Sequence, residues 1–157
     1  MPGQKQKKPV GLYLLLICMF FLALSGLSGG IALLIDPSGA LIQMPLSLLA
    51  RTPFKNFFLP ALILFSALGI YPALVFYGLR SPVELRWLKI INIYPEQNSA
   101  WTSALYVGII LVLWINFQIY LIGGGHYLQF IYALLGVLII ILTLLPSVKR
   151  YFLLAKD

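Results

Sequence analysis

Six polar side chains of this chain have types that could take part in chemistry or ligand binding. A carboxylate and an arginine bind charged groups, carboxamides offer both donors and acceptors, and an imidazole can act as a base near neutral pH. They are Asp36, Arg51, Asn116, Gln118, His126 and Gln129. If the fold brings them together, they would line a shallow pocket on the outer face of the protein.

A second set could form a nucleophile and a base. The segment Gly26-Leu27-Ser28-Gly29 matches the GxSG motif of rhomboid-type intramembrane proteases, and His126 is the one histidine available as a base. Those proteases have a six-helix core with the histidine inside a glycine-flanked helix, whereas His126 lies in a short turn. The resemblance stops at four letters, so the sequence predicts no catalytic residue here.

The same segment has a simpler interpretation as a helix contact. Ser25 with Gly29, and Gly26 with Gly30, are pairs of small residues four positions apart. Such pairs let two membrane helices approach closely. We therefore predict that Ser25, Gly26, Gly29 and Gly30 form a packing surface.

No cofactor or metal is predicted. The chain has one histidine, one cysteine (Cys18) inside an apolar run, and scattered carboxylates, which give no ligand cluster at a usable spacing. It has no phosphate loop and no dinucleotide fingerprint. A lone thiol also excludes an internal disulfide.

The composition is that of an integral membrane protein. Hydrophobic residues make up 61% of the 157 residues and charged residues only 10%, whereas a soluble domain is about half apolar and a quarter charged. Four runs carry no charge, and at 1.5 Å per residue each extends about 29 to 39 Å, enough to cross a hydrocarbon core. The runs are 10–35, 57–79, 101–122 and 127–145. We predict an all-α protein with four transmembrane helices, forming one domain over residues 1–157.

The positive charges predict an orientation. Nine Lys and Arg lie on the side of the termini and the segment after the second run, and two lie opposite. The nine are Lys5, Lys7, Lys8, Arg80, Arg86, Lys89, Lys149, Arg150 and Lys156, and the two are Arg51 and Lys55. The positive-inside rule then places both termini on the cytoplasmic side of the membrane. Because the net charge of +7 lies in these flanks, nucleic-acid binding is not expected.

Two short segments between the spans are apolar as well. Residues 37–56 form an outer loop whose stretch Ala40–Ala50 contains Pro45 and is too short to cross, so it is re-entrant or interfacial. Asp36 at its root either caps local amides or pairs with Arg51 or Lys55, and we predict that it anchors the turn.

On the cytoplasmic side, a capping box at Ser81-Pro82-Val83-Glu84 predicts a short amphipathic helix that Pro95 ends. Its apolar face would carry Val83, Trp87, Ile90, Ile91 and Tyr94. This helix either lies in the headgroup layer or packs between the second and third spans. The residues Gly123-Gly124-Gly125-His126 predict a tight turn between the last two helices.

Two amides lie within the third run. Asn116 and Gln118 are about 200° apart on a helix, so they face different neighbours. Buried amides in membrane bundles usually bond to other helices, and Gln118 could meet Gln129 across the turn.

Several motifs resemble those of small, uncharacterised bacterial four-helix membrane proteins. The motifs are Leu34–Gly39 with its Asp-Pro-Ser-Gly, Met44-Pro45, Thr52–Phe57, Pro60, Trp114-Ile115 with Gln118, Ile122-Gly123 and Leu128-Gln129. The resemblance implies a bacterial cell (inner) membrane and no particular activity.

Two interpretations of function stay open. The first is a non-enzymatic protein that associates with itself, a membrane partner or lipid. The second is a small-molecule or lipid-handling carrier or enzyme, with an outward pocket under the 37–56 loop. They differ in whether the polar candidates line one cavity.

Overall fold

In the computed structural model, residues 7–81 and 88–154 are described, and this part of the chain is helical without any strand. Four helices are long and apolar enough to span a membrane: Val10–Ile35 (α1), Phe58–Arg80, Ser99–Ile122 (α4) and Tyr127–Leu144 (α5). The prediction of an all-α chain with four such helices is confirmed. Each bound lies within two residues of the predicted one.

The second span is not a regular α-helix. It consists of α2 (Phe58–Phe65), a π-helical segment η3 (Ser66–Ile70) and α3 (Tyr71–Arg80). The backbone N–H of Tyr71 donates to the carbonyl of Ser66, five residues back. Pro72 has no N–H to offer the carbonyl of Leu68, four residues back, so the regular ladder is interrupted here. The result is a widened turn near the middle of the span.

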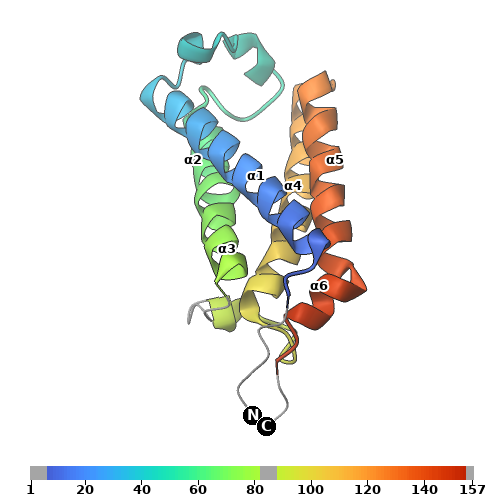
Figure 1. The fold of residues 1–157 in the computed structure, drawn as a ribbon. Coiled ribbons are helices and arrows are strands. Elements are labelled where there is room, and N and C mark those ends of the chain that lie inside the picture. Colours follow the sequence, from blue (N-terminus) through green and yellow to red (C-terminus); the bar gives the residue numbers. More distant parts are fainter. Residues whose placement is uncertain (1–6, 82–87, 155–157) are drawn as a thin grey trace, which may run out of the picture.

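The four spans form two pairs. The first span, α1, packs against α2, η3 and α3, while α4 packs against α5; the pairs meet where α1 contacts α5 and α3 contacts α4 (Figure 1). We call the end that carries residues 7–9 and 145–154 the terminal end. The opposite end, which carries residues 36–57 and the turn 123–126, is the loop end.

The main core occupies the terminal half of the bundle. Its fully buried side chains come from all four spans and include Leu12, Leu15, Met19, Leu22, Val75, Leu79, Trp101, Val107, Leu111 and Ile139. A smaller apolar cluster at the loop end joins Leu33, Leu49, Phe57 and Ala61. The loop therefore packs on the ends of α1 and α2 rather than on the main core.

The predicted amphipathic helix at the terminal end is wrong in its described part. Residues 82–87, which hold most of the predicted capping box and Trp87, lie outside the described residues. From Leu88 to Ile91 the chain forms one 3-10 turn (η4) instead of an α-helix that continues to Pro95. The reason is Asn92, whose Oδ1 accepts from the Tyr94 N–H at 3.0 Å and so closes a local turn.

A further short helix at the terminal end was not predicted. Pro146 starts α6 (Pro146–Tyr151), which carries Val148 into the core, and Phe152 just after it is buried too. Proline at the first position of a helix and apolar residues at this spacing are the signals that mark it in the sequence.

The 37–56 loop contains two short 3-10 turns, Ala40–Ile42 (η1) and Leu46–Leu49 (η2), and no long helix. In Figure 1 it lies beyond the ends of α1 and α2 and extends toward the α4–α5 hairpin.

Candidate functional site

The carboxylate of Asp36 is used by the turn that follows α1. It accepts hydrogen bonds from the Ser38 hydroxyl at 2.6 Å, the Leu41 N–H at 2.8 Å and the Ser38 N–H at 3.1 Å. The Ser38 hydroxyl and then the Leu41 N–H lower the pKa of the Asp36 carboxyl below its ordinary value of 3.8. Gly39 follows with φ +80°, where an added Cβ would overlap the carbonyl of Met44. Asp36 thus shapes the root of the loop.

Arg51 connects the loop to the other helix pair. Its Nη1 lies 2.6 Å from the position that a Cβ on Gly123 would occupy, and η2 contacts α4. Gly123 ends α4 in a left-handed conformation, with its N–H donating to Ile119. A cation at the carboxyl end of a helix is favourable because the last carbonyls carry partial negative charge. Arg51 therefore ties the loop to α4 and does not pair with Asp36.

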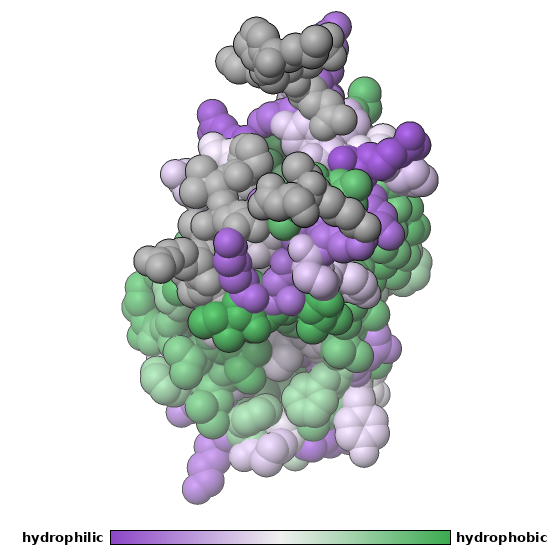
Figure 2. Space-filling view, turned by 90° about the horizontal axis from the view of Figure 1, so that it is seen from below, coloured by the Kyte–Doolittle hydropathy of each residue, from purple (hydrophilic) through white to green (hydrophobic). Residues whose placement is uncertain are grey.

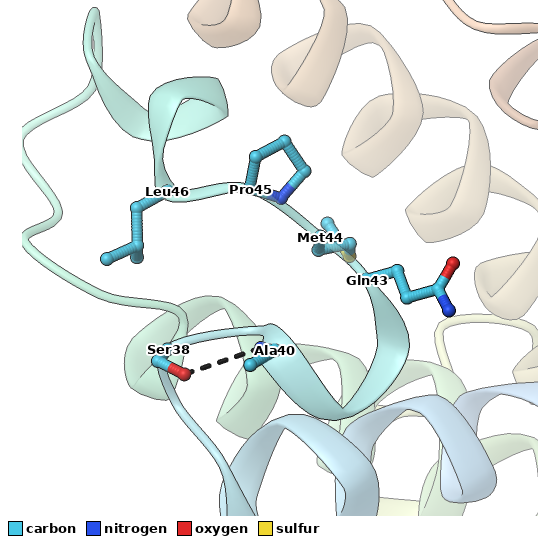
Figure 3. A pocket seen from close by; sticks show the side chains of 6 residues that line it. All are labelled: Ser38, Ala40, Gln43, Met44, Pro45 and Leu46. Atoms are coloured by element: carbon cyan, nitrogen blue, oxygen red, sulfur yellow. Dashed lines mark hydrogen bonds between the residues drawn. The ribbon is translucent and has the colours of Figure 1, made fainter.

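An open concavity of about 490 Å³ lies within the loop itself. Ser38, Ala40, Gln43, Met44, Pro45 and Leu46 line it. Figure 3 shows Ser38 and Ala40 on one side, joined by a 3.4 Å hydrogen bond, with Pro45 and Leu46 on the other. None of the six polar candidates lines this concavity.

His126 and Gln129 serve the start of α5. The Gln129 Oε1 accepts from the backbone N–H of His126 at 2.9 Å, as in a capping box. Ser28 lies in α1, where its hydroxyl donates to the carbonyl of Ser25 at 3.2 Å. His126 lies in the turn at the loop end. Ser28 and His126, the two residues of the GxSG interpretation, therefore each form a hydrogen bond within their own segment.

The two amides of α4 are separated, as their spacing predicts. Asn116 is exposed and its Nδ2 donates to the carbonyl of Val112, one turn back, at 2.8 Å. Gln118 is half-buried. The structure therefore disperses the six candidates over the loop root, the end of α4, the start of α5 and an exposed helix face.

The predicted packing residues lie where α1 crosses the π-helical segment. A Cβ on Gly26 would overlap the carbonyl of Leu68 and lie 2.7 Å from the nitrogen of Gly69; one on Gly30 would lie 2.7 Å from Cβ of Phe65. The packing at Gly29 is less close, because a Cβ there would meet only a side-chain atom of Leu64, at 3.4 Å. Ser25 donates its hydroxyl to Leu22 within α1.

A second close crossing was missed in the sequence. A Cβ on Gly108 of α4 would lie 3.0 Å from the carbonyl of Gly136 of α5, and one on Gly136 would lie 3.2 Å from the carbonyl of Gly108. Gly108 lies 15 residues before Gly123 and Gly136 lies 10 residues after His126, so their distances from the turn differ and do not by themselves predict the contact.

A buried polar layer at the terminal end was also missed. Its side chains at the start of α4 are Gln97, Asn98, Ser99, Thr102 and Ser103, with Thr143 from α5. The Trp101 Nε1 donates to the carbonyl of Thr143 at 2.8 Å, and Thr102 donates to the Oδ1 of Asn92 at 2.6 Å. These bonds connect α4 to α5 and to the segment before α4. They act as interhelical links of the kind that the sequence assigned to Gln118 and Gln129.

The surface of the terminal end is hydrophilic. Figure 2, which views this end, shows hydrophilic side chains gathered over it with hydrophobic ones beside them. Its described bases are Lys7, Lys8, Arg80, Lys89, Lys149 and Arg150, and Lys8 donates to the carbonyl of Arg80 at 2.7 Å. Within residues 7–81 and 88–154, no three His, Cys, Asp or Glu side chains are grouped so that they could hold a metal ion.

Comparison of the chain with protein-family models, with curated proteins and with solved structures gives no match.

Proposed function

We propose that this chain is a non-enzymatic, multi-pass membrane protein that acts by associating with another membrane-spanning protein through the loop-end half of its α4–α5 hairpin. The protein would span the cell membrane of a bacterium, with both termini on the cytoplasmic side. The proposal follows from how the packing is distributed along the hairpin.

The observation that carries the proposal is that burial stops halfway along the hairpin. After Leu111, only Ile115 is buried in α4, and no residue of α5 before Gly136 is buried. The ribbons of α2 and the hairpin diverge toward the loop end in Figure 1. Large side chains cover this half of the hairpin; exposed ones include Leu113, Phe117, Tyr120, Phe130 and Leu134. A helix pair that packs on its own chain over only half its length offers the other half to a neighbour.

The positive charges support the orientation. Six described bases lie at the terminal end against Arg51 and Lys55 at the loop end. With the terminal end in the cytoplasm, the 37–56 loop lies at the outer interface, where exposed Leu41 and Leu46 meet the headgroup region. Single cysteines in a Cys18→Ala background test this. An impermeant maleimide added to intact cells should label Lys55→Cys, and label Lys149→Cys only after permeabilisation.

Native mass spectrometry of the protein extracted with its surrounding lipid tests the association. A defined oligomer or a co-extracted membrane protein is the expected result. A monomer that retains one particular small molecule or lipid would overturn the proposal and favour a carrier or enzyme with a site at the loop.

A further inference from the structure

Asn116 differs from the exposed serines of the spans. Ser28 and Ser66 each have a single hydroxyl proton, and each donates it to a carbonyl of its own helix. The Asn116 carboxamide donates one N–H to Val112, which leaves its second N–H and its Oδ1 without a partner in the described part of the chain. An unpaired amide that faces lipid is costly, because hydrocarbon offers no hydrogen bonds.

The position of Asn116 along α4 places this cost on an isolated chain. It lies six residues, about 9 Å, from the end of α4 at Ile122, whereas the helix is about 36 Å long. If α4 is centred in a hydrocarbon core about 30 Å thick, the helix extends about 3 Å beyond each boundary and Asn116 lies about 6 Å inside the hydrocarbon.

The face around Asn116 can receive another helix. Ile109, Leu113 and Tyr120 lie on the same side of α4 at spacings of four, three and four residues, and they are 40%, 63% and 83% exposed. Every lipid-facing side of a helix has this spacing, so the spacing alone does not identify a contact face. The amide in the middle of the stripe distinguishes this face from the others.

We propose that the partner on this face is a second copy of the same chain, in a two-fold dimer in which the Asn116 carboxamides bond to each other. Two copies in one membrane have the same orientation, so their α4 helices run parallel and Asn116 lies at the same depth in both. A carboxamide presents a donor and an acceptor side by side and is complementary to itself across a two-fold axis. This inference rests on the proposed association and names its partner.

Cysteine cross-linking in native membranes tests the face. In a Cys18→Ala background, Leu113→Cys should give a disulfide-linked dimer on oxidation. Leu134→Cys is the matched control, because Leu134 lies at a similar depth on α5 and is 53% exposed; it should remain monomeric.

Dimer dissociation in liposomes tests the contribution of the Asn116 amide to dimer affinity. It is measured by energy transfer between labelled copies. Asn116→Leu should weaken the dimer by about three- to thirty-fold, the range found for hydrogen bonds between membrane helices. Asn116→Gln should retain most of the affinity because it keeps a carboxamide. Gln118→Leu, the control on a different face, should leave affinity unchanged.

The outcomes separate the two proposals. A defined oligomer whose cross-links run through Leu134→Cys, or one that Asn116→Leu leaves unchanged, would overturn the Asn116 dimer while association stands. A protein co-extracted with a different membrane protein in place of a second copy would do the same. A monomer in both measurements would overturn both.

Discussion

Alanine substitution at two glycines of α1 separates close packing from helix propensity. Gly26 and Gly29 are three residues apart in the same helix, so Gly→Ala changes their intrinsic helix propensity equally, by about 1 kcal/mol in favour of alanine. Their surroundings differ. A Cβ on Gly26 would overlap the backbone carbonyl of Leu68, whereas one on Gly29 would meet a side-chain atom of Leu64 at 3.4 Å, an ordinary contact.

The magnitude follows from that geometry. A Cβ on Gly26 would lie 2.7 Å from the nitrogen of Gly69 and closer still to the carbonyl of Leu68, so α1 and the π-helical segment must separate by more than about 0.7 Å before these contacts become ordinary. Because the obstacle is backbone, no side-chain rotation relieves it. Overpacking of this kind costs about 1–3 kcal/mol. We expect Gly26→Ala to be less stable than Gly29→Ala by that amount, with Gly29→Ala equal to or more stable than the unmodified protein.

Thermal or denaturant unfolding in one detergent, followed by helical circular dichroism, measures the difference. Helix content before unfolding serves as the control that both variants insert and fold. If Gly26→Ala is as stable as Gly29→Ala, the close crossing at Leu68 does not exist and the account of the π-helical segment is wrong.

Two more predictions concern hydrogen bonds. Trp101→Phe removes the buried donor to the carbonyl of Thr143 and should destabilise the protein by about 1–3 kcal/mol in the same unfolding assay. Trp114→Phe should reduce stability less, because the Nε1 of Trp114 has no acceptor in the described part of the chain. An equal loss of stability in the two variants would contradict the role assigned to the Trp101–Thr143 hydrogen bond. The bonds of Asp36 should make the loop sensitive to pH. Because the pKa of the Asp36 carboxyl is lower in the folded state, Asp36 contributes to the stability of the loop above about pH 4. This contribution to stability is lost as the pH falls through the lowered pKa. Asp36→Asn should speed amide exchange at Leu41 at neutral pH, and exchange that is unchanged would refute the turn-anchor role.

The spanning helices could be predicted because lipid leaves a chain few choices. A run without charge that is long enough to cross must be helical, since its backbone groups have no water to bond. Interruptions within a run were harder to see. The widened turn in the second span was not predicted, although Pro72 lacks the N–H that a regular helix needs. The hydrogen bond from the Tyr71 N–H to the carbonyl of Ser66 shows where this turn lies.

The polar residues were predicted by type but not by role. Asp36 was correctly assigned to its turn, because an aspartate before Pro-Ser-Gly bonds to its own neighbours. The sequence allowed a contact between Gln129 and Gln118 across the hairpin, but the Oε1 of Gln129 accepts from the backbone N–H of His126, three residues away. Asn92 ended a helix that its neighbours favoured. For Asp36 and Gln129 a local hydrogen bond competed with a distant partner, and the sequence does not rank the two.

The positions of small residues explain why the bundle closes at one end and opens at the other. Lipid is as apolar as leucine, so membrane helices associate where small residues allow close approach or where polar groups bond. The terminal half has both, in the Gly108–Gly136 crossing and in the Trp101–Thr143 bond. In the loop-end half of α4, residues 112–122 contain no glycine, alanine or serine, so nothing draws this stretch onto α1 or α2. The stretch carries two amides, Gln118, which is half-buried, and Asn116, which is exposed. This distribution of small and polar residues is what supports the proposed contact between this half of the hairpin and a neighbour in the membrane.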